Sequence, residues 1–306
     1  MNKINEIAKQ VYRKMILESY AIEPIKYNDE QASDLIKKGL EGDAPFLCAR
    51  MGCTELQTII FARKAQKWPQ KWMLAPFWKG VLRAIHNSSG FFNPTKDGVY
   101  KFADMYEADM KYIDILASWH PSERFFDDYL KSVPRISISQ IGPDLNNDSW
   151  TIALKNKRVL VVHPFAETIK KQYARREELF DNPNVLPEFK ELITVKAIQS
   201  IGGIIPQGYN TWFDALEFLC EQVSAQDFDI ALIACGAYGF PLASWIKQQG
   251  GKAILLGGSL QLLFGIKGKR WNKYDKINCL MNKPSWVTPD ESETPYTQVS
   301  ANFGYW

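Results

Sequence analysis

The hydrophobic pattern of this chain changes from a helical period in its first third to a strand–helix alternation in its second half. Apolar residues recur three and four positions apart over about 2–19 and 29–40, which predicts two helices. Asn28 precedes the second of them as a cap, and Gly42 follows its end. A short apolar run at 46–51 predicts a strand, and a helix is expected from about 55 to 67.

The second half of the chain consists of repeated pairs of an apolar strand and an amphipathic helix. The expected strands are 158–163, 193–198, 229–235 and 253–256, and the expected helices are 166–179, 211–224, 240–249 and 259–264. Nearly continuous apolar strands that alternate with helices are typical of a parallel sheet covered on both faces. The predicted fold class is therefore α/β: a Rossmann-like, mostly parallel sheet covered by helices, with a helical N-terminal portion, in a single domain over 1–306.

Two segments are less regular than this alternation. Residues 68–95 are rich in Trp, Phe, Pro and Gly and predict helix pieces joined by aromatic loops. Helices are expected at about 97–117 and 122–131, so that 68–135 forms a helical, aromatic-rich insertion, and 140–150 is expected to be a loop. The tail over 281–306 is rich in Pro and acidic residues but has an aromatic end, which predicts that it packs on the domain.

Composition narrows the class of protein. The chain has 306 residues, 46% of them hydrophobic and 23% charged, with a net charge of +3, which is typical of a globular protein and argues against a nucleic-acid partner. Its five cysteines form no C-x-x-C pair, so neither a zinc knuckle nor a disulfide framework is predicted. With no signal peptide and no apolar run of transmembrane length, a soluble, cytoplasmic protein is expected. Ten tryptophans and local basic clusters leave peripheral contact with the inner face of the membrane open.

Two consecutive strand–helix turns are rich in glycine and suit a phosphate ligand. Glycine lets the backbone approach a phosphate, and ligands of open α/β sheets bind at the carboxyl ends of the strands. The candidate nucleotide-binding residues of these turns are Gly236, Tyr238, Gly239, Gly257, Gly258 and Gln261. The alternative is that both stretches are tight turns and nothing more.

A basic loop follows the second turn directly. Lys267, Lys269 and Arg270 lie within four positions, next to Trp271. Such cations would neutralise a diphosphate, and the tryptophan would stack on a base or a sugar. The alternative is a solvated basic loop.

Two further strand ends carry candidate catalytic groups. In the run 50–55, Arg50 and Glu55 are the candidate catalytic residues, and Gly52 and Thr54 are candidate nucleotide-sugar-binding residues. The carboxylate of Glu55 would act as a general base or hold a divalent metal. The alternative is a helix-capping Glu55 paired with Arg50. His163 ends a predicted strand and is the second candidate base, with a structural histidine as the alternative.

The stretch LCARMGCTEL resembles the opening motif of the GT-D-fold glycosyltransferases, in which a strand ending in Arg-x-Gly is followed by Asp-x-Glu. The stretch from DIALIACGAYG to LGGSLQLLFGIKGKRW is similar to a second signature, found in GT-D-like proteins of bacterial polysaccharide biosynthesis. The resemblance implies a Rossmann-like nucleotide-sugar site and carries over Arg50, Gly52 and Glu55. Cys53 stands where the family has Asp, which leaves a requirement for Mn or Mg open.

These observations together predict a bacterial glycosyltransferase of capsule or exopolysaccharide biosynthesis. It would move a sugar from a nucleotide-diphosphate donor to a glycan or lipid-linked acceptor, with the aromatic segment 68–95 as an acceptor platform. Two alternatives stay open: a transferase of pyruvyl or phospho groups, and a non-catalytic nucleotide-binding subunit. The donor sugar, the stereochemistry and the oligomeric state, a homo-oligomer included, are not determined by these patterns.

Overall fold

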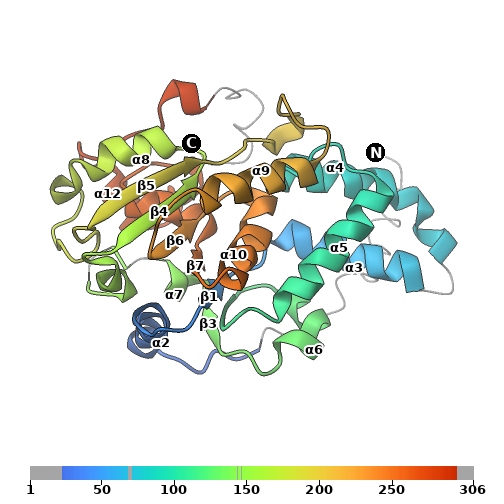
Figure 1. The fold of residues 1–306 in the computed structure, drawn as a ribbon, viewed down its shortest axis with the longest axis horizontal. Helices are drawn as coiled ribbons and strands as arrows, with labels where there is room; N and C mark the ends of the chain where they lie inside the picture. The colour runs from blue at the N-terminus through green and yellow to red at the C-terminus, as the bar shows by residue number, and fades with distance from the viewer. Residues whose placement is uncertain (1–22, 68–70, 143, 146, 295–306) are drawn as a thin grey trace.

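The computed structural model describes residues 23–67, 71–142, 144–145 and 147–294, and it contains one seven-stranded sheet (Figure 1). All of its strand pairs are parallel, and the order across the sheet is β3-β2-β1-β7-β6-β4-β5. The strands are β1 (Phe46–Ala49), β2 (Ile115–Ser118), β3 (Arg135–Ser137), β4 (Arg158–His163), β5 (Glu191–Lys196), β6 (Ile230–Ile233) and β7 (Lys252–Leu255). The predicted α/β class with a parallel, helix-covered sheet is confirmed. The helix expected at 2–19 and the end of the tail, 295–306, lie outside the described residues.

Helices cover both faces of the sheet. They are α2 (Asp29–Glu41), α3 (Cys53–Lys67), α4 (Trp78–Ser89), α5 (Lys96–Met110), α6 (Asp127–Leu130), α7 (Ile138–Ile141), α8 (Ala166–Tyr173), α9 (Trp212–Ser224), α10 (Gly239–Gln248), α11 (Leu260–Leu263) and α12 (Asp275–Met281). Short 3₁₀ helices complete the set: η1 (Lys71–Phe77), η2 (Pro121–Phe126), η3 (Trp150–Leu154), η4 (Arg176–Glu178), η5 (Ile201–Gly203), η6 (Gly236–Tyr238), η7 (Gly257–Ser259), η8 (Lys269–Trp271) and η9 (Glu291–Glu293). Figure 1 shows α9 and α10 in front of the strands and α3, α4 and α5 gathered at one side.

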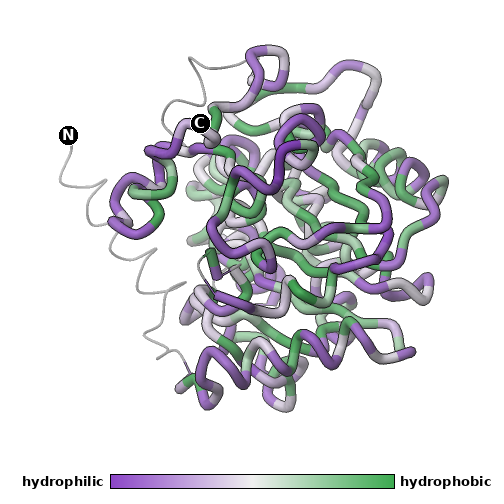
Figure 2. The backbone as a smooth tube through the Cα atoms, turned by 90° about the vertical axis from the view of Figure 1, so that its left-hand side faces the viewer, coloured by the Kyte–Doolittle hydropathy of each residue, from purple (hydrophilic) through white to green (hydrophobic). Residues whose placement is uncertain are grey.

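Alternate residues of the central strands supply two separate hydrophobic cores. In β4, Leu160 and Val162 join the core beneath α3, α5, α9 and α10, whereas Val159 and Val161 join the core beneath α2, α8 and α11. Figure 2 shows apolar stretches inside the molecule and hydrophilic ones along the outer turns. Both faces of a parallel sheet are buried, which is why its strands read as continuous apolar runs.

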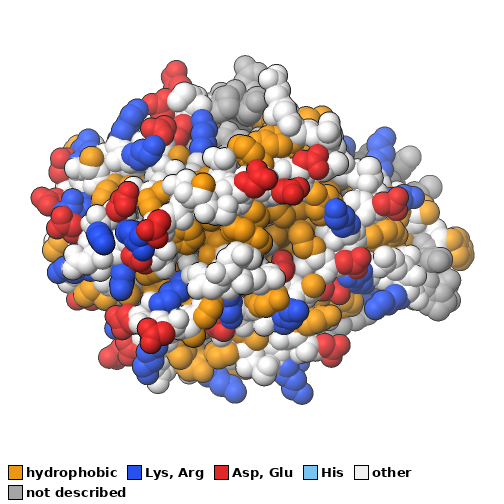
Figure 3. Space-filling model, viewed as in Figure 1, with side chains coloured by type: hydrophobic (Ala, Val, Ile, Leu, Met, Phe, Trp, Pro, Cys, Tyr) orange, Lys and Arg blue, Asp and Glu red, His pale blue; other side chains and the backbone are white. Residues whose placement is uncertain are grey.

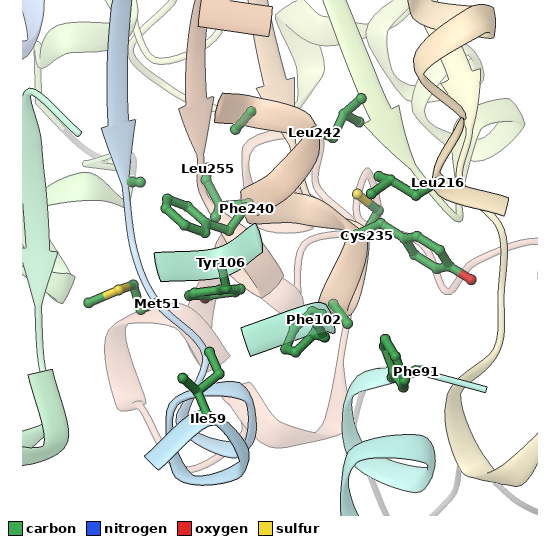
Figure 4. Close-up of a cluster of buried hydrophobic side chains, with 14 of the residues drawn as sticks. Met51, Ile59, Phe91, Phe102, Tyr106, Leu216, Cys235, Phe240, Leu242 and Leu255 are labelled. Atoms are coloured by element: carbon green, nitrogen blue, oxygen red, sulfur yellow. The ribbon is translucent and has the colours of Figure 1, made fainter. Parts of the chain in front are cut away.

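Aromatic rings dominate the core around α5. The rings of Tyr106 and Phe240 lie 4.5 Å apart between their centroids, and Phe102 lies 5.0 Å from Phe91 (Figure 4). Phe91 and Phe92 are fully buried, and Trp78 is nearly so. These aromatic residues of 68–95 therefore belong to the core and do not form the expected exposed platform; in contrast, the side chain of Trp72 is 73% exposed.

Charged side chains are spread over the surface that faces the viewer in Figure 3, whereas apolar side chains gather in its middle, around α9 and α10. Phe218 on α9 is 40% exposed. No single-sign patch occupies this face.

The segment between α5 and β4 differs from the sequence prediction. The helix expected at 97–117 ends at Met110, and the following apolar run forms β2. The helix expected at 122–131 is divided into η2 and α6, and β3 was not predicted. Strands of three or four residues give too short an apolar run to be told from the end of a helix.

Candidate functional site

Residues at the carboxyl ends of five neighbouring strands line a small cavity of about 90 Å³. They are Arg50 after β1, Gly257 and Gly258 after β7, Gly236 and Tyr238 after β6, His163 at the end of β4, and Gln199 and Ser200 after β5. Parallel strands bring these residues together because all of their carboxyl ends lie at one edge of the sheet.

A larger cavity of about 640 Å³ lies over the other half of the same edge. Its lining includes Trp119 after β2, Ser139 after β3, and Trp271, Tyr274 and Ile277 from the segment after β7. The volume is within the usual range of small-molecule sites, roughly 300–1,000 Å³.

The two cavities meet where β1 pairs with β7. Arg50, Gly258 and Arg270 line both of them. The chain continues from β1 to β2 on one side of this boundary and reaches β7 from β6 on the other side. The boundary is thus a switch in strand order, which is the usual place of ligands in open α/β sheets.

The glycines after β7 allow two guanidinium groups to lie directly on the backbone. Gly257 has a φ of +59°, and a Cβ atom there would lie 2.6 Å from Nε of Arg50. A Cβ atom on Gly258 would overlap the guanidinium group of Arg270. The glycine turn therefore holds two cations at the boundary between the cavities.

The side chains of both arginines are partly buried. The Nε atom of Arg50 is buried and has no hydrogen-bond partner within the described part of the chain. Leaving such an N–H group unsatisfied is costly, so a ligand oxygen that accepts its bond would be stabilising. The guanidinium group of Arg270 lies 5.3 Å from the ring centroid of Trp271.

Glu55 lies in the first turn of α3, beside the glycine after β1. Its carboxyl group is buried against Gly52, where a Cβ atom would overlap it. Burial raises the pKa of Glu55 above its usual range, although Arg50 and the hydroxyl of Ser89 oppose this shift. The side chain lines a cavity of only about 20 Å³ that also includes Arg50, Gly257 and Tyr106.

His163 is buried with one of its two ring nitrogens in use. The N–H group of Phe165 donates a hydrogen bond of 2.9 Å to Nδ1. Burial first, and the charge of Arg270 second, lower the pKa of His163 to about 3. A nitrogen that accepts a hydrogen bond carries no proton, so the proton of the neutral ring is on Nε2.

Three of the expected nucleotide-binding residues have structural partners. The amide of Gln261 donates to the carbonyl oxygens of Ile266 and Lys267 at 3.3 and 3.0 Å. Tyr238 stacks on Trp212 with 5.0 Å between ring centroids, although both Tyr238 and Gln261 also line the small cavity. Gly239 permits close packing, because a Cβ atom there would lie 2.7 Å from Leu255.

Three further expected binding residues, Lys267, Lys269 and Thr54, line neither the small nor the larger cavity. Lys267 is held by its backbone N–H, which donates to the carbonyl oxygen of Val287 at 2.8 Å, and Lys269 is exposed. Thr54 lies in the first turn of α3 and lines neither cavity. Of the three cations in the basic loop, only Arg270 reaches the site.

Sequence reasoning missed Trp119, Gln199, Ser200 and Tyr274. Trp119 was missed because β2 was read as part of a helix. Gln199 and Ser200 directly follow a strand that was predicted, so their place after it was the available signal. Tyr274 carried no such signal, because it depends on how the segment after η8 folds back over the larger cavity.

The donor set around Glu55 does not fit a resident divalent cation. Mg²⁺ and Mn²⁺ prefer several oxygen ligands, whereas Glu55 adjoins the cationic Arg50 and the hydroxyl of Ser89. At Cys53 the sulfur is contacted by Nε2 of His120 and by the amide of Gln57, each at 3.2 Å. Within the described ranges no three His, Cys, Asp or Glu residues form a group able to hold a metal ion.

Comparisons with protein-family models, with curated proteins and with solved structures found no match. Among the helices described here, none is long and apolar enough to cross a bilayer.

Proposed function

We propose that this chain is a glycosyltransferase that binds a nucleotide-diphosphate sugar at the boundary between the two cavities. The observation that carries the proposal is the pair of guanidinium groups, Arg50 and Arg270, lying on Gly257 and Gly258 where the strand order switches. Guanidinium groups recognise phosphate oxygens through paired hydrogen bonds. The larger cavity would take the nucleoside, with Trp119 and Trp271 in its lining.

The arginines would also assist the chemical step. Negative charge develops on the diphosphate as the glycosidic bond breaks, and fixed cations stabilise that charge without rearranging. An acceptor hydroxyl must lose its proton, and Glu55 is the candidate for receiving it, because burial raises its pKa above the usual range of a carboxyl group. The acceptor is proposed to be a glycan or a lipid-linked sugar of surface-polysaccharide biosynthesis.

Two observations favour a second candidate, a nucleotide-binding subunit without catalytic activity. Glu55 is confined to a cavity of about 20 Å³. Nδ1 of His163 accepts a hydrogen bond from the backbone and Nε2 carries the ring proton, so neither nitrogen is free to accept a proton from a substrate. Both candidates predict nucleotide binding. They differ in whether a nucleotide sugar is consumed.

The test is calorimetric titration of UDP and other nucleoside diphosphates into the wild type and two variants. Arg270→Ala is expected to weaken binding about 10- to 100-fold, the value of a charge-assisted hydrogen bond to phosphate. Lys269→Ala removes a neighbouring cation that is exposed and outside the cavities, so its affinity should match the wild type.

Turnover separates the two candidates. Release of nucleoside diphosphate from a panel of nucleotide sugars, with glycan acceptors present, would support the transferase. Binding without release would favour the non-catalytic subunit. If no nucleoside diphosphate binds to the wild type, or if both variants lose affinity equally, the assignment of the arginine pair is wrong.

A further inference from the structure

We propose that His163 is a ligand-binding residue that acts as a fixed, neutral hydrogen-bond donor, presenting Nε2–H to an oxygen of the bound diphosphate sugar in the small cavity. The inference rests on the proposed diphosphate site but not on catalysis, since a binding protein would use the same donor. It assigns to His163 the opposite role from the general base that its position at a strand end suggests.

The first support is the hydrogen bond that fixes the tautomer. The backbone turns directly after β4, so that the N–H group of Phe165 points back at Nδ1 of His163, 2.9 Å away. The rings of His163 and Phe165 also lie 4.8 Å apart, which restricts rotation of the imidazole. A flipped ring would set the Cδ2 carbon against this N–H group, which would lose its acceptor, and would put Cε1 in the place of Nε2.

The second support is that Nε2 of His163 is available to a ligand. Nε2 of His163 has no hydrogen-bond partner among the residues described, and the side chain lines the small cavity together with Arg270, Gln199 and Ser200. The Nε2–H group is open to this cavity, so an oxygen of a bound ligand can accept its hydrogen bond.

The third support is the charge around the ring. The groups that face His163 are Arg270 from η8, Cys235 after β6 and Lys196, its register partner on β5. Burial raises the pKa of the Cys235 thiol, which keeps it neutral, and no carboxylate lines the cavity to stabilise an imidazolium. The positive charge of Arg270 disfavours protonation of His163. A bound diphosphate would therefore meet one cation, Arg270, and one neutral donor, His163.

The tautomer can be tested without any ligand. The chain has three histidines, so a long-range ¹H–¹⁵N spectrum of the full-length protein is simple, and the His163→Gln variant identifies the signals of His163. We expect a protonated Nε2 and an unprotonated Nδ1 at every pH from about 5 to 8, since the pKa lies near 3. An imidazolium in that range, or a proton on Nδ1, would overturn the inference.

The donor role is tested by two substitutions that place an amide differently. The nitrogen of His163→Gln reaches the position of Nε2, whereas that of His163→Asn reaches only the position of Nδ1. Titration with UDP and with inorganic pyrophosphate should show a loss of about 10-fold or more for Asn and a much smaller loss for Gln. Melting curves of both variants check that they are folded.

Each outcome of the titration decides a different claim. Equal affinity in the wild type and His163→Asn would overturn the donor role even if nucleotides bind. Failure of the wild type to bind either probe would overturn the proposed function together with the donor role, while the spectrum would still decide the tautomer.

Discussion

The carboxyl group of Asp109 shows how burial sets the chemistry of a single residue. It lies at the end of α5 against α10, where Ser244 and Gln248 donate hydrogen bonds to it. Loss of hydration is larger than the effect of these bonds, and it raises the pKa of Asp109 from 3.8 to about 6. The protein therefore holds a desolvated carboxylate at neutral pH.

Replacing Asp109 by Asn should stabilise the protein in a pH-dependent way. Because the pKa is raised in the folded state, the stability associated with this group is present at low pH and is lost as the pH rises through about 6. Asp109→Asn should be close to the wild type near pH 4 and more stable by about 1–3 kcal/mol at pH 8. Urea denaturation at both pH values measures this difference.

The control is Asp43→Asn, because Asp43 is exposed in the loop after α2. Its free energy of unfolding should stay within about 0.5 kcal/mol of the wild type at either pH. A stabilisation by Asp109→Asn that is the same at pH 4 and pH 8 would show that charge burial is not its cause.

Residue-level chemistry was predicted best where a strand end was predicted. Gly257, Gly258 and Arg270 were expected to bind the nucleotide sugar and Arg50 to be catalytic, and all four lie at the boundary between the cavities. What the sequence did not show is that the glycines accommodate arginine side chains, because that depends on the pairing of β1 with β7.

At the scale of elements, the segment after α12 stabilises the start of α8. The carboxylate of Glu293 in η9 is fully buried and accepts hydrogen bonds from the N–H groups of Glu167 and Thr168, at 2.8 and 3.0 Å, and from the hydroxyl of Thr168. An acidic side chain also interacts favourably with the N-terminal end of a helix dipole.

Glu293→Gln should destabilise the protein by about 1–3 kcal/mol, because the bonds lose their charge and an amide N–H faces backbone donors. Glu291→Gln is the matched control, since Glu291 lies in the same 3₁₀ turn but is exposed. Its effect should be within about 0.5 kcal/mol of zero in urea denaturation. If the two variants are equally stable, the cap contributes nothing to the stability of the fold.

Element boundaries were predictable where local signals were strong. The side-chain oxygen of Asn28 accepts a hydrogen bond of 2.9 Å from the N–H of Gln31, as expected of a helix cap, and β4 has its expected bounds. β2 and β3 were missed because these short segments become strands through pairing with strands that are distant in sequence. Their local sequence does not distinguish them from helix or loop.

At the scale of the whole molecule, the order of the strands creates the site. The sequence predicts that strand ends carry ligand residues, but it gives no order for the strands. The order β2-β1-β7-β6 sets Arg50 beside the glycine turn and divides the carboxyl edge into a small and a large cavity. Missing β2 and β3 therefore meant missing the larger cavity, which lies over them.

The same arrangement predicts how nucleotide binding depends on metal ions. Arg50 and Arg270 place two positive charges at the boundary between the cavities, which is the charge that one divalent cation would provide to a diphosphate. Glu55, the carboxylate nearest to Arg50 in sequence, has a raised pKa and so a reduced tendency to bind a cation. UDP affinity in EDTA should thus stay within about threefold of the affinity in manganese, a difference below 1 kcal/mol.

Calorimetric titration of UDP in EDTA and in manganese measures this difference, with Arg270→Ala as the informative comparison. If manganese restores binding to Arg270→Ala but leaves the wild type unchanged, the arginine replaces the metal charge. If EDTA abolishes binding to the wild type and manganese restores it, a cation is part of the site and the arginine pair does not suffice.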